Sequence, residues 1–197
     1  MEKIPQQATA NLVKIVLFGP ESTGKTTLSR QLARYYNTVW VREYAREYLQ
    51  DKWNNERLTC QHKDLIPIAI GQMNLENDLV KKADKVLICD TDLLETKVYS
   101  EAYYGGYVDP ELNHAALKNT YDLYLLTYID TPWEADDLRD RPEQREAMFS
   151  AFEETLKKHN RPYVILKGGV KNRLDLAVSA INSILQQRNN LDSYNII

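Results

Sequence analysis

Five short apolar runs recur along the chain, and apolar residues in the stretches between them return at helical spacing. The runs are rich in β-branched residues and are predicted as strands over residues 12–18, 38–41, 85–90, 121–127 and 162–166. Helical patterns fill residues 25–36, 42–51, 63–83, 92–103, 143–159 and 172–187. Strands that alternate with helices in this way form a parallel sheet with helices on both faces. We therefore predict an α/β fold of three layers with a five-stranded parallel sheet.

The length of the chain, 197 residues, is enough for one domain with a full hydrophobic core. Because no internal repeat or glycine-rich linker divides it, we predict a single domain over residues 1–197 with its core at about 12–187. Residues 1–11 and 188–197 lie outside this core, and we expect both ends to be loosely held.

A phosphate-binding loop follows the first predicted strand. From Gly19 to Thr27 the chain reads Gly-Pro-Glu-Ser-Thr-Gly-Lys-Thr-Thr, the G-x-x-x-x-G-K-[ST] motif of P-loop NTPases. Backbone N–H groups of such a loop point at phosphate oxygens, and the helix that follows adds its positive dipole end. We expect Lys25 beside the β- and γ-phosphates of ATP and the Thr26 hydroxyl on Mg²⁺. The residues expected to bind the nucleotide here are Gly19, Glu21, Ser22, Thr23, Gly24, Lys25, Thr26 and Thr27.

Ligands of parallel α/β sheets bind beyond the carboxyl ends of the strands, so the residues after each later strand are candidates. Glu43 follows the second strand, where a carboxylate would face the γ-phosphate and could bind or deprotonate a substrate hydroxyl. The alternative is a solvated helix face on which Arg42, Glu43, Arg46 and Glu47 pair their charges.

Two aspartates follow the third strand. An acidic residue at this place in a P-loop protein commonly holds Mg²⁺. Asp92 fits better as the cap of the next helix, so we assign the metal to Asp90, together with Thr26. Asp90 is also a rival of Glu43 for the role of general base.

Residues 130–145 form a polar segment after the fourth strand that contains Arg139, Arg141 and Arg145. We predict a helical lid that closes over ATP and brings Arg139 and Arg145 to the transferring phosphate, with Arg141 as a substitute. An ordinary charged loop is the alternative. After the fifth strand, glycines precede Lys171, Asn172 and Arg173, which we expect to lie against adenine.

The composition excludes several classes of function. Hydrophobic residues make up 43% of the chain, charged residues 27%, and the net charge is −3, which gives no basic footprint for nucleic acid. No apolar run approaches the roughly 20 residues of a membrane helix. Two cysteines form no disulfide framework, and the three histidines form no zinc motif with them, so we expect a cytoplasmic protein.

Taken together, these motifs resemble the ribosylnicotinamide kinase domain of NadR-type proteins, among the P-loop nucleoside and nucleotide kinases with AAA-type ATP binding. The resemblance rests on the P-loop, on residues 43–48 and 90–92, and on Gly71-Gln72, Thr131-Pro-Trp133 and Asp137-Leu-Arg139. It covers about residues 12–185. It implies ATP- and Mg²⁺-dependent phosphorylation of the 5′-hydroxyl of nicotinamide riboside to nicotinamide mononucleotide, on a salvage route to NAD.

The chain departs from that family in two respects. It has no H-x-G-H motif, so the adenylyltransferase activity of NadR-type proteins is not expected. Arg42 stands where some relatives place an aromatic residue that stacks on the nicotinamide. The rings that could replace it are those of Trp40, Tyr44, Trp53, Tyr103, Tyr104 and Tyr107.

Two alternatives remain open at this point. One is a P-loop kinase for another nucleoside or small molecule. The other is a regulatory ATPase or switch that hydrolyses its nucleotide slowly. The chain lacks the Asn-Lys-x-Asp motif of guanine recognition, which disfavours a GTPase. A nucleic-acid-dependent ATPase is disfavoured by the acidic charge balance.

Overall fold

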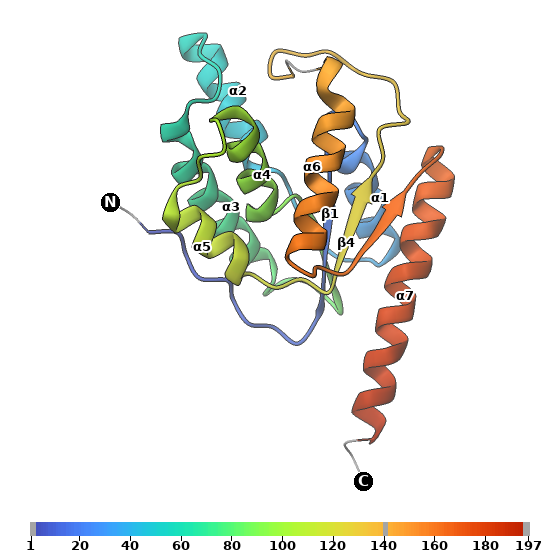
Figure 1. Ribbon diagram of the computed structural model, residues 1–197. Coiled ribbons are helices and arrows are strands. Elements are labelled where there is room, and N and C mark those ends of the chain that lie inside the picture. The colour runs from blue at the N-terminus through green and yellow to red at the C-terminus, as the bar shows by residue number, and fades with distance from the viewer. Residues whose placement is uncertain (1–2, 140–141, 195–197) are drawn as a thin grey trace.

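The computed structural model describes residues 3–139 and 142–194 and shows an α/β fold with one central sheet (Figure 1). The strands are β1 (Val13–Phe18), β2 (Trp40–Val41), β3 (Val86–Asp90), β4 (Leu123–Thr127) and β5 (Tyr163–Leu166). They are all parallel, in the order β2-β3-β1-β4-β5. The predicted fold class, with its five parallel strands, is confirmed.

Helices cover both faces of the sheet. They are α1 (Lys25–Tyr35), α2 (Tyr44–Glu56), α3 (Leu65–Leu79), α4 (Leu93–Tyr103), α5 (Pro110–Lys118), α6 (Arg145–Lys158) and α7 (Val170–Tyr194), with 3₁₀ turns at His62–Asp64 and Pro142–Gln144. One apolar core packs α3, α4, α5 and α6 against the sheet, and α1 and α7 form the core of the opposite face. All six residues of β1 are buried, as expected for a central parallel strand. None of the helices in the described part of the chain is long and apolar enough to cross a bilayer.

Helix α5 was not predicted from the apolar pattern. It begins at Pro110, and the Asp109 carboxylate accepts the backbone N–H of Glu111, which together make a regular helix start. Only Leu112 and Ala116 of α5 are buried, so its apolar stripe is too short to stand out in the sequence.

The amino-terminal segment is held by hydrogen bonds rather than loosely. Gln7 donates to the Glu76 carboxylate of α3 at 2.8 Å, and the Ala8 N–H donates to Asn77 at the same distance. The buried ammonium of Lys14 donates to the Ala8 carbonyl at 2.9 Å. The expectation of a loose end is therefore wrong for this segment.

The carboxyl-terminal expectation is wrong for residues 188–194, because α7 continues past residue 187 to Tyr194. Residues 1–2 and 195–197, which these two expectations also included, lie outside the described residues. Arg188 on this extension pairs with Asp122, which precedes β4, at 2.8 Å. This ion pair joins the helix to the segment before β4. No apolar stripe in the sequence predicted that the helix would extend this far.

The predicted helical lid is corrected by the structure. Residues 130–139 are irregular, a 3₁₀ turn covers Pro142–Gln144, and α6 begins only at Arg145. Pro132 has no N–H to donate, and the Asp136 carboxylate accepts the N–H of Leu138, which favours a local turn over a helix. Arg141 lies outside the described residues.

Gly71 in α3 provides a test of helix packing. A Cβ atom there would lie 2.1 Å from Cε1 of Tyr44, because the Tyr44 ring of α2 rests on the α3 backbone at this point. Glycine to alanine inside a helix normally stabilises by up to about 1 kcal/mol. We expect Gly71→Ala to reduce the free energy of unfolding by about 1–3 kcal/mol instead, since the ring must move.

Urea unfolding in a double-mutant cycle checks this prediction. In the Tyr44→Ala background the same Gly71→Ala change should be neutral or stabilising, because no ring occupies the space. An equal loss of stability in both backgrounds would show that the ring contact is not the cause.

Candidate nucleotide-binding site

The P-loop runs from the end of β1 to the start of α1 and packs tightly against the end of β4. Gly19 has a φ of 134°, and a Cβ atom there would lie 2.8 Å from the Thr127 hydroxyl oxygen. The hydroxyls of Thr23 and Thr127 are 2.7 Å apart and share a hydrogen bond. Gly24 has a φ of 83° at the position before α1. Glycine is thus required twice, once by close approach and once by a left-handed turn.

Lys25 extends back along its own loop. Its ammonium donates to the carbonyls of Gly19 at 2.5 Å and Pro20 at 2.9 Å, and it forms an ion pair with Glu95 at 3.2 Å. Burial lowers the pKa of Lys25, but the carboxylates of Glu95, Glu43 and Asp90 together raise it above its usual value. The side chain is therefore a buried positive charge inside the P-loop, as the motif predicts.

Asp90 ends β3 as a buried carboxylate beside the P-loop. Both of its oxygens are inaccessible to solvent and accept no hydrogen bond of ordinary geometry within the described residues. Burial and the nearby Glu43 raise the pKa of Asp90, whereas the Thr26 hydroxyl and Lys25 lower it. The net result is a pKa of about 6. An unsatisfied carboxylate next to a hydroxyl is the donor set that Mg²⁺ uses beside nucleotide phosphates, so these residues fit the ion.

No group of three or more His, Cys, Asp or Glu residues within residues 3–139 and 142–194 could hold a metal by itself. Asp92, by contrast, caps α4 as predicted, since its carboxylate accepts the Glu95 N–H at 3.0 Å. It also accepts the Tyr124 hydroxyl at 2.8 Å, and burial raises its pKa to about 7.

Glu43 stands at the N-terminus of α2, with an extended backbone and a half-buried side chain. Its carboxylate acts on the pKa values of Lys25 and Asp90, which places it at the same site. The alternative of a solvated helix face holds only for its neighbours: Arg42 pairs with Glu47 on the surface at 2.8 Å. Arg46 instead reaches Asp136 of the segment after β4, at 2.7 Å.

The segment after β4 contacts the P-loop at Ser22, which has a φ of 56°. The Ser22 hydroxyl accepts the N–H of Glu134 at 2.8 Å, and its carbonyl accepts the Thr131 hydroxyl at 2.8 Å. Arg145 donates to the Thr131 carbonyl at 2.8 Å and to the Ser22 carbonyl at 3.4 Å. Burial and then Arg173 lower the pKa of Arg145 from its ordinary value. Of the predicted lid arginines, Arg145 therefore lies against the P-loop.

Arg139 lies further from the P-loop. It donates to the Glu134 carbonyl at 2.6 Å and pairs with Asp136 at 3.2 Å. Its predicted contact with a phosphate stays a prediction.

Arg173 connects the P-loop to the loops after β4 and β5. Its guanidinium donates to the carbonyls of Thr23 at 2.6 Å, Tyr128 at 2.8 Å and Gly168 at 2.8 Å, and it pairs with Asp130. The N–H groups along the edge of the Arg173 guanidinium therefore bind acceptors of the protein itself. Of its predicted companions, Asn172 donates to the Lys167 carbonyl at 2.8 Å and Lys171 is exposed.

The aromatic candidates are widely separated. Tyr103 lies beside the P-loop, whereas the Trp40 ring packs in the core under α1 and α7, with Arg30 over it. The Trp53 ring contacts Arg57, and His62 contacts both Tyr104 and Tyr107. A small pocket at the P-loop is lined by Pro20, Glu21, Tyr99, Tyr103, Trp133, Arg145 and Met148.

Two residues of this site were missed in the sequence, namely Glu95 and Tyr99. Glu95 and Tyr99 lie one turn apart on α4; Glu95 is buried and Tyr99 is partly buried. Glu95 is the acidic residue in the first turn of this helix, among apolar neighbours, and that placement is the signal in the sequence that could have indicated it. Trp133 was noticed only as part of the Thr-Pro-Trp motif.

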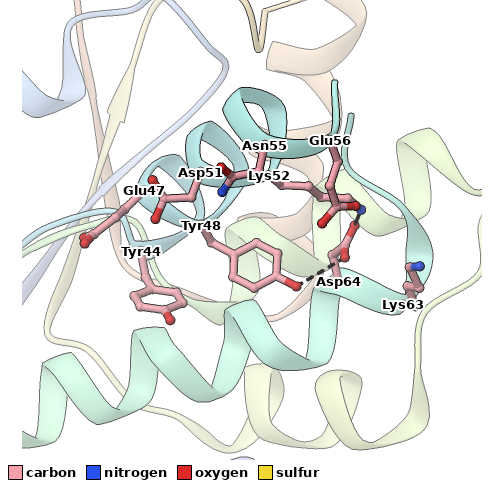
Figure 2. Close-up of a pocket in the computed structure, with 9 residues that line it drawn as sticks. All are labelled: Tyr44, Glu47, Tyr48, Asp51, Lys52, Asn55, Glu56, Lys63 and Asp64. Atoms are coloured by element: carbon pink, nitrogen blue, oxygen red, sulfur yellow. Dashed lines mark hydrogen bonds and ion pairs between the residues drawn. The ribbon is translucent and has the colours of Figure 1, made fainter. Parts of the chain in front are cut away.

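A second pocket of about 410 Å³ lies between α2 and the start of α3 (Figure 2). Tyr48 and Lys52 of α2 both point at Asp64, and the Lys52–Asp64 ion pair of 2.5 Å is buried. No P-loop residue lines this pocket, and the lid-facing Arg46 is not part of it either. We therefore place the nucleotide site at the P-loop and not here.

The fold and the loop together define a P-loop nucleotide-binding protein. A family model described as an AAA domain matches residues 14–173. The chain is 32% identical over 169 residues to the trifunctional NAD biosynthesis/regulator protein NadR of Salmonella typhimurium, covering 84% of this chain and 41% of that protein. The chain belongs to the AAA domain family and is homologous to NadR.

Solved structures agree with this assignment. The crystal structure of NadR in complex with NR matches with a TM-score of 0.72 and 26% identity, over 87% of this chain and 51% of that one. Deoxyadenosine kinase from M. mycoides matches with a TM-score of 0.62 and 18% identity, over 87% and 100% of the two chains. The latter shows the fold alone, that of P-loop nucleoside kinases. The chain spans about half the length of the NadR proteins it matches.

Asp90 provides a test of the site that needs no ligand. A carboxyl pKa raised to about 6 in the fold means that the folded state holds the charged form less well than the unfolded chain. The resulting loss of folding stability is absent below the unfolded pKa. It grows as the pH rises above that value and is complete once the pH is above about 6. Asp90→Asn should therefore stabilise the protein by about 1–3 kcal/mol at pH 7.5 in EDTA, and the gain should disappear near pH 4.

Urea unfolding at the two pH values measures this difference. Asp175→Asn, on the exposed face of α7, is the matched control and should change stability little at either pH. A variant at Asp90 that is less stable than the wild type at pH 7.5 would contradict the prediction.

Proposed function

We propose that this protein is an ATP-dependent kinase that phosphorylates the 5′-hydroxyl of nicotinamide riboside and forms nicotinamide mononucleotide. The observation that carries the proposal is the arrangement at the P-loop, where Glu43 lies within electrostatic reach of Lys25 and three aromatic rings line a pocket with Pro20 and Glu21 of the loop. Homology to NadR, which has been solved with NR bound, supports the same acceptor.

For the nucleotide, the P-loop amides and Lys25 would bind the β- and γ-phosphates. Thr26 and Asp90 would hold Mg²⁺, which when bound neutralises phosphate charge. Because the edge of Arg173 is occupied by four protein acceptors, its planar face is the part that can contact adenine. Lys171 and Asn172 precede Arg173 at the start of α7, directly after the glycines that follow β5, and we propose that all three residues lie against adenine.

For the acceptor, we assign Glu43 to the ribose hydroxyls and to the removal of the 5′-hydroxyl proton. Asp90 is the rival base, but both of its oxygens are buried and are assigned to Mg²⁺, whereas Glu43 is half-buried and reachable. Arg145 adjoins the Ser22 carbonyl and is the lid arginine placed to stabilise the transferring phosphate, with Arg139 as a second.

For the base, we assign the pocket lined by Tyr99, Tyr103 and Trp133. Nicotinamide riboside carries a positive pyridinium, and aromatic faces attract cations. Glu21 lines the same pocket and adds a carboxylate. The Arg145 guanidinium lies 5.7 Å from the centroid of the Trp133 ring, so it would have to turn to the transferring phosphate before a pyridinium could use that face. A neutral nucleoside would gain less from the aromatic faces and the Glu21 carboxylate.

The proposal predicts a specific product. Incubation with ATP, Mg²⁺ and a panel of nucleosides should yield nicotinamide mononucleotide at the highest kcat/KM, as measured by mass spectrometry. Lys25→Ala should reduce the rate by about 100-fold or more, since one electrostatic donor to the phosphates contributes roughly 3–4 kcal/mol. Turnover of other nucleosides without turnover of nicotinamide riboside would overturn the acceptor, and ATP hydrolysis without any phosphorylated acceptor would favour a regulatory ATPase.

The aromatic pocket predicts that its rings, and not the tyrosine hydroxyl groups, determine the affinity for nicotinamide riboside. Tyr103→Leu and Trp133→Leu should each raise KM for nicotinamide riboside by about 5- to 30-fold and leave KM for ATP nearly unchanged, because each ring is worth about 1–2 kcal/mol to a cation. Tyr103→Phe is the matched control and should retain affinity, since it keeps the ring. Equal KM values in Tyr103→Leu and the wild type would remove Tyr103 from the base site.

A further inference from the structure

Glu95 and Lys25 form a buried ion pair at the centre of the P-loop. The Lys25 ammonium has three protons, and its three contacts are the carbonyls of Gly19 and Pro20 and the carboxylate of Glu95. The second oxygen of Glu95 accepts the Gly19 N–H at 3.4 Å. Only 10% of the Lys25 side chain and 4% of the Glu95 side chain are exposed. Glu95 therefore holds both the lysine and the first residue of the loop that the lysine serves.

The groups around Glu95 are mostly acidic. Lys25 faces it from α1, Glu43 from the start of α2, Asp92 from the N-terminus of α4, and Tyr99 from the next turn of α4. Burial above all, with Glu43 and Asp92, raises the pKa of Glu95 well above its ordinary value, and contact with the Lys25 ammonium is what lowers it. The charge of Glu95 thus depends on the position of one ammonium.

A nucleotide phosphate at the P-loop competes with Glu95 for that ammonium. The phosphate group is more strongly charged than the carboxylate, so Lys25 gains by turning towards it. A buried carboxylate that loses its contact with a cation is strongly unfavourable, and binding a proton is the direct way to remove the charge.

We propose that Glu95 is a positioning residue that holds Lys25 within the loop and takes up one solvent proton when the ammonium turns to the phosphates. Lys25 stays protonated throughout, a Glu95 oxygen gains an O–H bond, and the proton comes from the buffer. Nucleotide binding is then coupled to proton uptake. This inference rests on the nucleotide binding of the proposed function but not on the identity of the acceptor.

Calorimetry with a non-hydrolysable ATP analogue and Mg²⁺ tests the inference. Titrations at pH 7.5 in buffers of different ionisation enthalpy give the number of protons bound per nucleotide. The wild type should take up about one proton per bound nucleotide, and Glu95→Gln should take up close to none. Because the competing charge is gone, Glu95→Gln should also bind the analogue about three- to tenfold more tightly.

Glu101→Gln is the matched control. Glu101 also pairs with a lysine of α4, Lys97 at 2.6 Å, but it is 36% exposed and lies away from the P-loop. This variant should keep the proton uptake and affinity of the wild type. The pH dependence of the wild type provides a second measurement, which does not depend on whether a variant folds. Its proton uptake should decline at low pH, because Glu95 is already neutral there.

The outcomes separate the two proposals. Wild-type binding without proton uptake, or equal uptake in Glu95→Gln and the wild type, would overturn the role of Glu95 and leave the kinase proposal intact. No binding of the analogue at all would overturn both.

Discussion

The candidate site is organised around one buried cation among three carboxylates. Lys25 contacts Glu95 and lies within electrostatic reach of Glu43 and Asp90, while its remaining protons go to the carbonyls of its own loop. Without this ammonium the carboxylates would repel one another in a buried space, where such repulsion is weakly screened. The same charge is the one that a phosphate group requires, so the interaction that stabilises the site also prepares it to bind an anion.

This arrangement has a cost in stability that the fold must offset. Asp90 is buried with no ordinary hydrogen bond in the described part of the chain, and its raised pKa records the penalty. Thr91, directly after it, has a φ of 77°, an unusual backbone for a β-branched residue. Strain and unsatisfied polar atoms thus lie together at the end of β3. Such features are common where a protein is adapted to bind a ligand at the expense of stability.

Rigid supports surround the site and offset part of this cost. Thr127 packs under Gly19 and Thr23, and Arg173 joins the P-loop carbonyl of Thr23 to the loops after β4 and β5. On the other side, the pair of Arg46 and Asp136 joins α2 to the segment after β4. The P-loop is therefore held from the sheet and from both neighbouring loops, which keeps its N–H groups in place for phosphate without rearrangement.

The sequence by itself determined the parallel sheet, the P-loop with Lys25 and Thr26, and the capping role of Asp92, because periodicity, glycine spacing and helix capping act over a few residues. It also indicated Glu43 and Asp90, since the ends of parallel strands meet at one edge. Only the tertiary structure decided what Glu95, Tyr99 and Arg173 contact, why the segment at 130–139 is irregular, and how the chain ends are anchored. Each of these depends on partners distant in sequence, such as Lys25 and Glu95 or Thr23 and Arg173, and no local pattern encodes where a long side chain will find its charge or carbonyl.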